Sequence, residues 1–568
     1  MNPDAARLDL EAWRASFPDD PYRADRFLPA LVHRSLDQAR ARSLDQAASA
    51  FARQVIAEVA PLAERTEHRL HLPELARHDR FGRVTEEVRF DPDYHGSGHV
   101  VWESGIVAHS GVPGRAFEQG TLLYLLSLEG ETGHACPATC TIGLARALRR
   151  RAEPEVRDRF LPPLLELDYG RAERASQFLT EIQGGSDVGA NAAVAEPAGD
   201  GTYRVTGEKW FCSVADAQQF LLTARVPGAP DGTKGLGCFV MPRFLDGAPN
   251  GFRIRRLKEK LGTRGLASAE IDLDGAVAWP IGPVEDGFKT AVGVVLNTSR
   301  WLTAVGGAGM MWRSYLEAAG FARHRRAFGR PIGDFPLVRR TLAGMKVQWL
   351  GALHAVWVLT GLEDAIDAGT AGDEEVALHR FLVNATKYEA SWRATSVVRD
   401  AIEVLGGNGT IEEFSVLPRL YRDAMVYESW EGTHNVLVTQ VLNDCRRLDL
   451  LSVLDGWLTG VLEAVSSPAG KEAAATALAA LDDEIAGARR AVGDPGYGAA
   501  HFRTHLGRIM LVVEVASMLD SLEHDGPEEL GPVADLLARL ELESGYRPEA
   551  DPAFTDRVDA ALAGDLSG

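Results

Sequence analysis

The spacing of apolar residues changes twice along this chain, and that change constrains the fold more than any other feature. From about residue 35 to 175, apolar residues recur every three to four positions, as in 47–62 and 120–128, which is the helical period. From about 176 to 285, short runs of β-branched and aromatic residues alternate with turn sequences, and from 288 to 447 the helical spacing returns. The chain therefore predicts segregated helical and strand blocks, not an alternating βαβ fold.

The middle block predicts a small antiparallel sheet. Gly-Asp-Gly, Pro-Asp-Gly and Pro-Asn-Gly turns separate its apolar runs. The runs expected to form strands are 202–206, 220–226, 236–240 and 269–273. By contrast, residues 72–99 are rich in Asp, Arg, Pro and Gly and are expected to be irregular.

The two later helical blocks predict a bundle followed by an appended domain. Long periodic segments such as 304–324 and 337–361 are expected to be helices. The last block is Ala-rich at 473–480 and is interrupted by Pro-Gly breaks. The predicted domains are 1–175 (helical), 176–287 (β), 288–447 (helical) and 448–568 (helical, appended).

The composition is that of a large, soluble, acidic protein. The chain has 568 residues, of which 45% are hydrophobic and 25% charged, and its formal net charge is -20. An excess of acidic residues disfavours general binding to a phosphate backbone, so nucleic acid is not an expected partner. The start of the chain lacks the pattern of a signal peptide, and no stretch of about 18 residues is apolar. We expect a cytoplasmic protein that does not enter a membrane.

The five cysteines predict neither a disulfide scaffold nor a metal site. They form no repeated pair and no Cys/His cluster. Cys136 and Cys140 are four positions apart and are expected to pack on one face of a helix.

One segment near the end of the second helical block carries the residues for proton abstraction. Glu431 stands between Trp430 and Gly432, shortly after the Gly-rich run 403–410. The glycine allows a flat ligand to approach the backbone, and the aromatic side chain can exclude water and raise the basicity of the carboxylate. The structural alternatives are a helix C-cap for the glycines and an exposed helix-start acid for Glu431.

Three further segments have the chemistry to hold a planar, phosphorylated group. Backbone amides around two glycines in 178–187 can cradle an anion, although the segment also fits a hairpin turn. In 207–213 an aromatic pair precedes Ser213, so a ring could stack there, or the aromatics could belong to the core. The arginines of 323–330 could meet a pyrophosphate or complement a helix dipole.

The order of these motifs resembles the acyl-CoA dehydrogenase family. Thr-Glu-x-x-Gly-Gly-Ser-Asp, Gly-x-Lys-Trp-Phe-x-Ser, Arg-x-x-Phe-Gly-x-Pro, Gly-Gly-Asn-Gly and Trp-Glu-Gly-Thr follow one another over about 260 residues. The N-terminal stretch 73–92, Gln183, the segment 257–268 and the appended domain are similar to the AidB-type branch. The resemblance implies an α+β fold with an N-terminal helical domain, a middle antiparallel β domain, a C-terminal four-helix bundle and an appended helical domain.

The resemblance also implies non-covalently bound FAD. Leu179 and Thr180 match positions on the pyrimidine side of the flavin, and Gly185 and Ser186 match positions at its phosphates. The other positions that match FAD contacts in the family are Phe211 and Ser213 beside the ring, Thr433 and Asn435 after the catalytic acid, and Arg325, Phe328, Glu403, Gly406 and Gly407, which reach the FAD of a neighbouring subunit. Many relatives carry Gln where this chain has Glu403.

Glu431 matches the catalytic base of the family. In that chemistry it removes the α proton of an acyl thioester while hydride leaves the β carbon, and hydrogen bonds to the thioester carbonyl stabilise the enolate. A few relatives carry the base at the position of Ser299, which cannot serve, so Glu431 is the expected base. Arg300, Trp430 and Gly432 are the expected substrate contacts.

Two alternatives share the fold implied by the resemblance. Flavin monooxygenases and nitroalkane oxidases use the same scaffold, but the former generally lack the carboxylate and the latter carry Asp. AidB-type proteins are linked to DNA through a basic last domain, whereas this one is acidic, so weak or no duplex binding is expected. The family further implies a homotetramer. The acyl group, the electron acceptor and the purpose of 448–568 are left open by the sequence, the last being a narrowed CoA entrance or a subunit interface.

Overall fold

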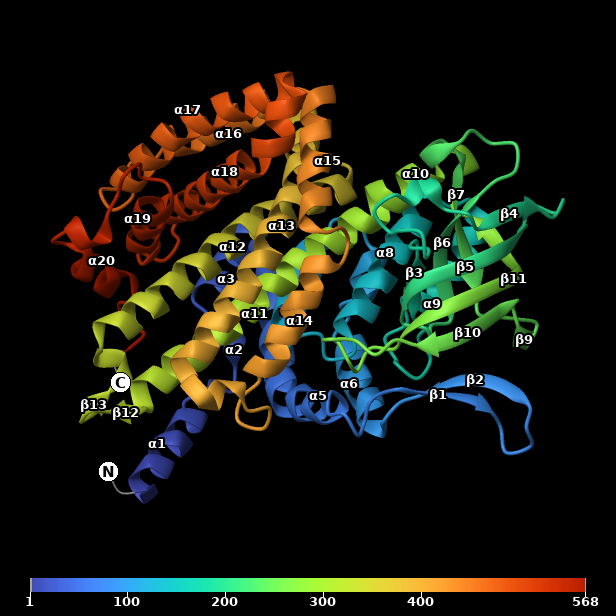
Figure 1. Ribbon diagram of the computed structural model, residues 1–568, viewed down its shortest axis with the longest axis horizontal. Helices are drawn as coiled ribbons and strands as arrows, with labels where there is room; N and C mark the ends of the chain where they lie inside the picture. The colour runs from blue at the N-terminus through green and yellow to red at the C-terminus, as the bar shows by residue number, and fades with distance from the viewer. Residues whose placement is uncertain (1–2, 567–568) are drawn as a thin grey trace. The chain divides into compact units, whose positions relative to one another are not determined.

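Helices and strands occupy separate stretches of the chain in the computed structural model, which describes residues 3–566 (Figure 1). Backbone contacts divide the chain into two compact units. A sheet-containing unit comprises Gln54–Leu302 together with Trp430–Gly432. A helical unit comprises the chain up to Arg53, Thr303–Ser429 and the chain from Thr433 onward.

The main sheet of the first unit has strand order β10-β11-β5-β4-β6-β3, with β7 pairing with β6 and β11. Its strands are β3 (Ala175–Phe178), β4 (Val194–Pro197), β5 (Tyr203–Ser213), β6 (Gln219–Arg225), β7 (Leu236–Pro242), β10 (Phe252–Leu257) and β11 (Ser268–Pro280), and β8 (Phe244–Leu245) and β9 (Ala248–Pro249) form a small hairpin of their own. The four predicted runs each begin within a residue of β5, β6, β7 and β11, which confirms these strands. The runs for β6 and β7 also end within two residues of the strand ends, whereas β5 and β11 continue seven residues beyond the predicted ends.

The sheet is mixed, not wholly antiparallel as expected. β6 pairs in parallel with both β3 and β4, whereas the other pairings are antiparallel. A long connection, 179–193, separates β3 from β4 and gives the chain the length to re-enter the sheet in the same direction. That connection carries the Thr180 to Ser186 motif, so the motif lies at the end of β3.

Two strands lie in the stretch expected to be irregular. β1 (Glu74–His78) and β2 (Val84–Arg89) form an antiparallel hairpin. Asp79 closes its turn by accepting hydrogen bonds from the backbone N–H groups of Phe81 and Arg83. Glu86 accepts from the backbone N–H of Ile254 at 2.8 Å, which attaches the hairpin to β10. The turn-forming residues that suggested irregular structure are therefore the turn and anchor of a hairpin.

The helices of this unit are α5 (Ala60–Thr66), α6 (Pro92–Glu103), α7 (Ala116–Leu126), α8 (Ala135–Arg151), α9 (Pro154–Leu164) and α10 (Gly287–Thr290). Cys136 and Cys140 lie on one buried face of α8 with their Sγ atoms 3.8 Å apart, which confirms the helical placement. The sheet buries stacked aromatic rings, with Phe178 to Phe220 centroids 4.5 Å apart and Phe220 to Phe252 centroids 4.9 Å apart. These rings come from β3, β6 and β10, and β3 leads directly into the predicted cofactor motif at Thr180 to Ser186.

Long helices make up the second unit. Its helices before the appended domain are α1 (Pro3–Ala15), α2 (Pro21–Ala24), α3 (Phe27–Ser35), α4 (Gln38–Gln54), α11 (Asn297–His324, in this unit from Thr303 onward), α12 (Pro336–Ala368), α13 (Asp373–Leu405), α14 (Leu417–Ser429) and α15 (His434–Arg447), and β12 (Arg326–Ala327) pairs with β13 (Arg330–Pro331). Within residues 3–566, α12 has the length and composition of a membrane span, but 83% of its most apolar window is buried, as in a core helix.

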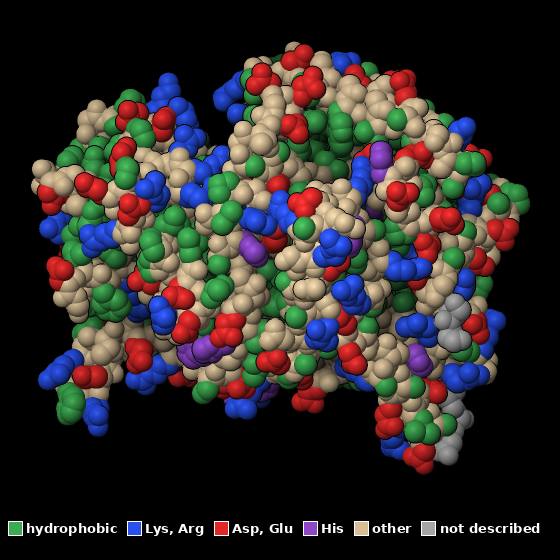
Figure 2. All heavy atoms as spheres, turned by 180° about the vertical axis from the view of Figure 1, so that it is seen from behind, with side chains coloured by type: hydrophobic (Ala, Val, Ile, Leu, Met, Phe, Trp, Pro, Cys, Tyr) green, Lys and Arg blue, Asp and Glu red, His purple; other side chains and the backbone are tan. Residues whose placement is uncertain are grey.

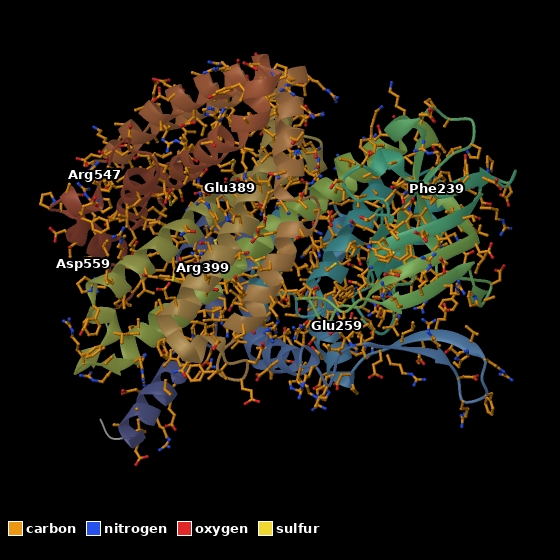
Figure 3. The ribbon with its side chains drawn as sticks, in the orientation of Figure 1. Phe239, Glu259, Glu389, Arg399, Arg547 and Asp559 are labelled. Carbon is orange, nitrogen blue, oxygen red and sulfur yellow. The ribbon has the colours of Figure 1, made fainter. Side chains whose placement is uncertain are left out.

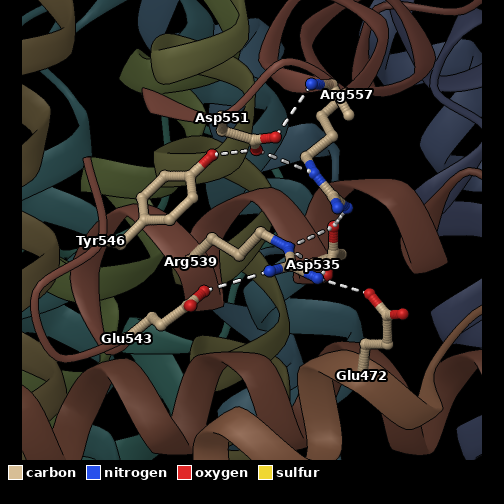
Figure 4. A network of polar contacts seen from close by, with 8 residues as sticks. Glu472, Asp535, Arg539, Glu543, Tyr546, Asp551 and Arg557 are labelled. Atoms are coloured by element: carbon tan, nitrogen blue, oxygen red, sulfur yellow. Dashed lines mark hydrogen bonds and ion pairs between the residues drawn. The ribbon is translucent and has the colours of Figure 1, made fainter. Parts of the chain in front are cut away.

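The appended helices are α16 (Leu450–Glu463), α17 (Lys471–Gly493), α18 (Pro495–Glu523), α19 (Leu530–Glu541) and α20 (Phe554–Ala561). Arg539 on α19 pairs with Asp535, Glu543 and Glu472, and Arg557 on α20 pairs with Asp535 and with Asp551 (Figure 4). A network of shared partners stabilises more than isolated surface pairs, which contribute at most about 1 kcal/mol each. Ion pairs thus supplement the apolar contacts that join these helices.

Buried charges lie where the appended helices meet the bundle. Arg393 on α13 donates to Glu514 on α18 at 2.5 Å and to Glu389 on its own helix at 3.4 Å. Figure 3 labels Glu389 at this position. Burial raises the pKa of Glu514 to about 8, although the positive charge of Arg393 acts in the opposite direction. One guanidinium therefore faces two buried carboxyl groups.

Candidate functional site

Glu431 lies in a short turn between two helices with its backbone in the left-handed region. Helix α14 ends at Ser429 and α15 begins at His434. The φ of Glu431 is 55° and that of Gly432 is 110°. A side chain at positive φ costs roughly 1–2 kcal/mol, and such strain is found mainly where surrounding contacts hold it. Because Glu431 is half-buried and precedes the helix, it is not the exposed helix-start acid of the structural alternative.

Arg300 holds this turn. Its Nε donates a hydrogen bond of 2.9 Å to the backbone carbonyl of Glu431, and its side chain is buried. Both residues belong to the sheet-containing unit. A charge-assisted bond of this kind contributes more than a neutral one. The structure thus gives Arg300 a contact with the backbone of the predicted base, and its expected contact with substrate stays a prediction.

Trp430, which precedes Glu431, packs against an apolar core. This core is that of the sheet and includes Cys136 and Cys140. The hydrogen bond to Cys140 and burial raise the pKa of Cys136 well above its usual value, with a further contribution from the nearby negative charge of Glu431. The sequence showed the cysteine pair but not its proximity to Glu431, because the two segments are almost 300 residues apart.

The predicted cradle lies in the connection after β3. The backbone carbonyl of Thr180 accepts from Trp210 N at 2.9 Å, and that of Leu179 accepts from Asn191 Nδ2 at 2.8 Å. A Cβ at Gly185 would lie 2.7 Å from Thr180 Oγ1, so only glycine fits there without displacement. Ser186 is exposed beside it. The structure therefore brings Thr180 and Gly185 together and ties this loop to β5.

A buried ion pair that the sequence did not reveal fixes the same loop. Lys209 Nζ donates to Glu181 Oε1 at 2.7 Å and to the carbonyl of Thr223 at 2.8 Å. Glu181 also accepts from the backbone N–H of Ala192 at 2.6 Å. Burial opposes ionisation of Glu181, but Lys209 and these hydrogen bonds bring its pKa below the usual value. Both residues lie in motifs that carry the family resemblance, but the sequence alone did not indicate that they form an ion pair.

Phe211 presents an exposed aromatic face at the end of β5. Its side chain is 56% exposed, which rules out the core position considered from the sequence. Lys258 Nζ lies 3.6 Å from the Trp210 ring centroid and 4.7 Å from that of Phe211. Ser213 follows on the same strand, with its hydroxyl 3.4 Å from that of Ser268. An exposed ring of this size beside a hydroxyl is suited to stacking with a planar ligand.

In the helical unit, the other predicted cofactor residues lie at chain reversals. Phe328 has a φ of 53° and is 96% exposed at the β12–β13 turn, and Arg325 precedes that turn. Gly406 caps α13 with a φ of 62°, so the helix-cap interpretation of the glycine run is confirmed. Glu403 and Gly407 are exposed on either side of the cap. An exposed cap does not exclude the predicted cofactor role.

Thr433 and Asn435 begin helix α15. Thr433 is the N-cap residue, and its side chain makes no capping hydrogen bond. Asn435 Oδ1 accepts a hydrogen bond from Arg503 on α18 at 3.1 Å. Among residues 3–566, no group of three or more His, Cys, Asp or Glu residues is placed to hold a metal ion.

Comparisons with known proteins agree with this fold and arrangement. Residues 176–276 match the middle domain of acyl-CoA dehydrogenases, 285–444 match their C-terminal domain, and 15–171 match the N-terminal domain of the adaptive response protein AidB. The chain belongs to the acyl-CoA dehydrogenase family.

Within the family, its similarity extends to AidB and to a nematode relative. It is 34% identical to the Escherichia coli K12 protein named AidB over 65% of this chain and 68% of that protein. It is 31% identical to acyl-CoA dehydrogenase family member 11 of Caenorhabditis elegans, over 74% of this chain and 70% of that one.

Solved structures place the appended helices within the shared fold. The C. elegans ACDH-11 structure in complex with C11-CoA covers 95% of this chain and is itself covered to 94%, with a TM-score of 0.86 and 27% identity. The apo-form of Bd2924 covers 89% of this chain and is covered to 98%, with a TM-score of 0.80 and 27% identity. An acyl-CoA dehydrogenase from Bacillus anthracis complexed with FAD is 18% identical with a TM-score of 0.70, which shows a common fold.

Proposed function

We propose that this protein is an FAD-dependent dehydrogenase that oxidises the α,β bond of an acyl thioester, carried on CoA or on a carrier protein. The observation that carries the proposal is the turn at Glu431, a carboxylate on strained backbone held by a buried arginine. Family membership supports the reaction class, and the binding of C11-CoA by the similar ACDH-11 supports acyl-CoA as the substrate class.

The residues present fit FAD. Gly185 leaves the space beside Thr180 that a Cβ would fill, and Phe211 offers an exposed face for a planar ring. The residues that would hold the cofactor are Leu179, Thr180, Gly185, Ser186, Phe211, Ser213, Thr433 and Asn435. When bound, FAD supplies the acceptor for a hydride from the β carbon of the substrate.

Glu431 is assigned to the proton transfer. Its carboxylate takes the α proton of the thioester as the β carbon loses hydride, so the substrate loses two electrons and two hydrogens and becomes an enoyl thioester. Arg300 keeps the backbone of Glu431 in the left-handed conformation, which sets the direction of the side chain. Trp430, anchored in the core, excludes water from the carboxylate.

Anaerobic titration of the purified FAD-containing protein with acyl-CoAs tests this function. Bleaching of the flavin absorbance by butyryl-, isobutyryl-, isovaleryl- or octanoyl-CoA is the expected result, and Glu431→Gln should keep FAD while losing the bleaching. If Glu431→Gln is reduced as fast as the parent protein, Glu431 is not the base. If oxygen reacts rapidly with the reduced protein and gives a hydroxylated product, the protein is an oxygenase of the same fold.

We extend the proposal to assembly and location: a cytoplasmic homotetramer in which Arg325, Phe328, Glu403, Gly406 and Gly407 serve a neighbouring subunit's FAD. The nearly complete exposure of Phe328 supports a covering partner. On the face seen in Figure 2, basic and acidic side chains are interspersed over most of the surface, which is consistent with weak or no duplex binding. Light scattering tests the homotetramer, and a DNA mobility shift tests the weak or absent binding of duplex DNA.

A further inference from the structure

The appended helices bring an arginine to the start of α15. Arg503 on α18 donates from Nη1 to Asn435 Oδ1 at 3.1 Å and from Nε to Tyr388 Oη at 3.2 Å. Asn435 stands four positions after Glu431 in the chain. A residue outside the motifs of the family resemblance therefore contacts a residue that the resemblance assigns to the cofactor.

Two aromatic rings lie beside this guanidinium. Its Cζ lies 5.4 Å from the ring centroid of Tyr388 and 5.7 Å from that of Trp392, both on α13. The two rings stack on each other at 6.1 Å, and Trp392 is 49% exposed. Close to these rings and hydrogen-bonded through two nitrogens, Arg503 has lost much of the rotamer freedom that an anion would otherwise have to restrict.

The charge of Arg503 is not matched by a carboxylate. Other arginines of the appended helices form ion pairs, including Arg489 with Asp455, Arg508 with Glu484, and Arg539 and Arg557 with Asp535. Among residues 3–566, no Asp or Glu oxygen lies within the 4.0 Å ion-pair distance of Arg503. In a chain of net charge -20, an exposed, oriented guanidinium with only neutral partners is available for an external anion.

The neighbouring carboxyl group does not compensate. Burial on α13 raises the pKa of Glu389 above its usual value, although the positive charge of Arg503 acts to lower it. The hydrogen bond from Arg503 also orients the Asn435 amide, because an amide oxygen that accepts leaves the NH₂ group as the outward donor. The guanidinium of Arg503 and the NH₂ group of Asn435 thus lie next to each other, and both are hydrogen-bond donors.

We propose that Arg503 is a further FAD-binding residue, which binds the diphosphate of FAD together with Asn435, so that the appended helices contribute to holding the cofactor. The diphosphate is the charged part of FAD, and the planar fork of a guanidinium matches phosphate oxygens. This inference rests on the proposed FAD-dependent function. It also assigns a purpose to the appended helices other than closing the CoA entrance.

The test is the FAD affinity of the full-length apoprotein, measured by quenching of flavin fluorescence at low and at moderate ionic strength. Arg503→Ala should weaken FAD binding about tenfold to a hundredfold, the range of a charge-assisted hydrogen bond, and should flatten the salt dependence. Arg503→Lys should recover part of the loss, since it restores the charge but not the fork. The matched control is Arg489→Ala, which removes an exposed appended-domain arginine paired with Asp455.

Apoprotein melting temperatures separate binding from folding. If Arg503→Ala and Arg489→Ala melt alike and only Arg503→Ala weakens FAD, the inference holds. Equal FAD affinities for these two variants overturn it while leaving the proposed function intact. A parent protein that binds no FAD overturns the proposed function and this inference with it.

Discussion

Replacing Arg300 with lysine tests the contribution of the hydrogen bond from Arg300 to the backbone of Glu431. The variant keeps a positive charge but loses the Nε donor that lies 2.9 Å from the carbonyl of Glu431. A hydrogen bond to a charged group contributes about 1.5–3 kcal/mol, and this one helps to hold the left-handed backbone of Glu431, which costs roughly 1–2 kcal/mol. The turn should relax, and the population with a correctly directed carboxylate should fall.

The measurement is stopped-flow reduction of the flavin under anaerobic conditions over a range of acyl-CoA concentrations. At 1.36 kcal/mol per factor of ten, we expect the limiting rate to fall roughly tenfold to a hundredfold, with little change in FAD content or apparent substrate affinity. Arg253→Lys, at an exposed arginine paired with Asp272, is the control and should be unchanged.

The two parameters distinguish the possible roles of Arg300. A limiting rate within about twofold of the parent would refute the reasoning. An unchanged limiting rate with weaker substrate affinity would instead give Arg300 the substrate contact that the sequence predicts.

The remaining predictions concern the cofactor cradle and the buried charges. Lys209→Met should destabilise the protein by about 3–5 kcal/mol in urea denaturation, because it leaves Glu181 buried without its partner, whereas Lys289→Met at an exposed pair should change little. Gly185→Ala should lower FAD occupancy at unchanged secondary structure, because the new methyl group meets a hydroxyl at 2.7 Å; equal occupancy would contradict the cradle. Glu514 has a folded pKa of about 8 against its usual 4.5, so its contribution to stability is complete below pH 4.5 and is lost as the pH rises to about 8. Melting temperatures should follow that decline in the parent protein and less steeply in Glu514→Gln.

Periodicity and turn chemistry predicted the elements whose signals are local. The strands around 202–213 and 219–225 and the helix carrying Cys136 and Cys140 follow from residue spacing alone. The parallel pairing of β3 with β6 does not, because β4, β5 and their connections lie between these two strands, and no local pattern specifies where the chain returns to the sheet.

The candidate site likewise has residues that local patterns predict and contacts that only tertiary packing determines. Glu431 and Phe211 stand in ordered motifs, and the sequence identified both as candidates. The contacts of Arg300 with Glu431 and of Arg503 with Asn435 join positions 131 and 68 residues apart. Such pairs depend on tertiary packing, so a single sequence gives their residue types but not their proximity.

The brevity of the Trp430–Thr433 link has a consequence for motion. A helix holds each end of the link, and Arg300 holds its middle. The carboxylate of Glu431 should therefore move less than a surface loop does on the nanosecond timescale. An added or deleted residue there would change the angular phase of α15 by about 100° relative to α14, since each helical residue turns the chain by that amount. Length variation should therefore be far less tolerated at this link than at the β1–β2 turn, which carries exposed Phe81.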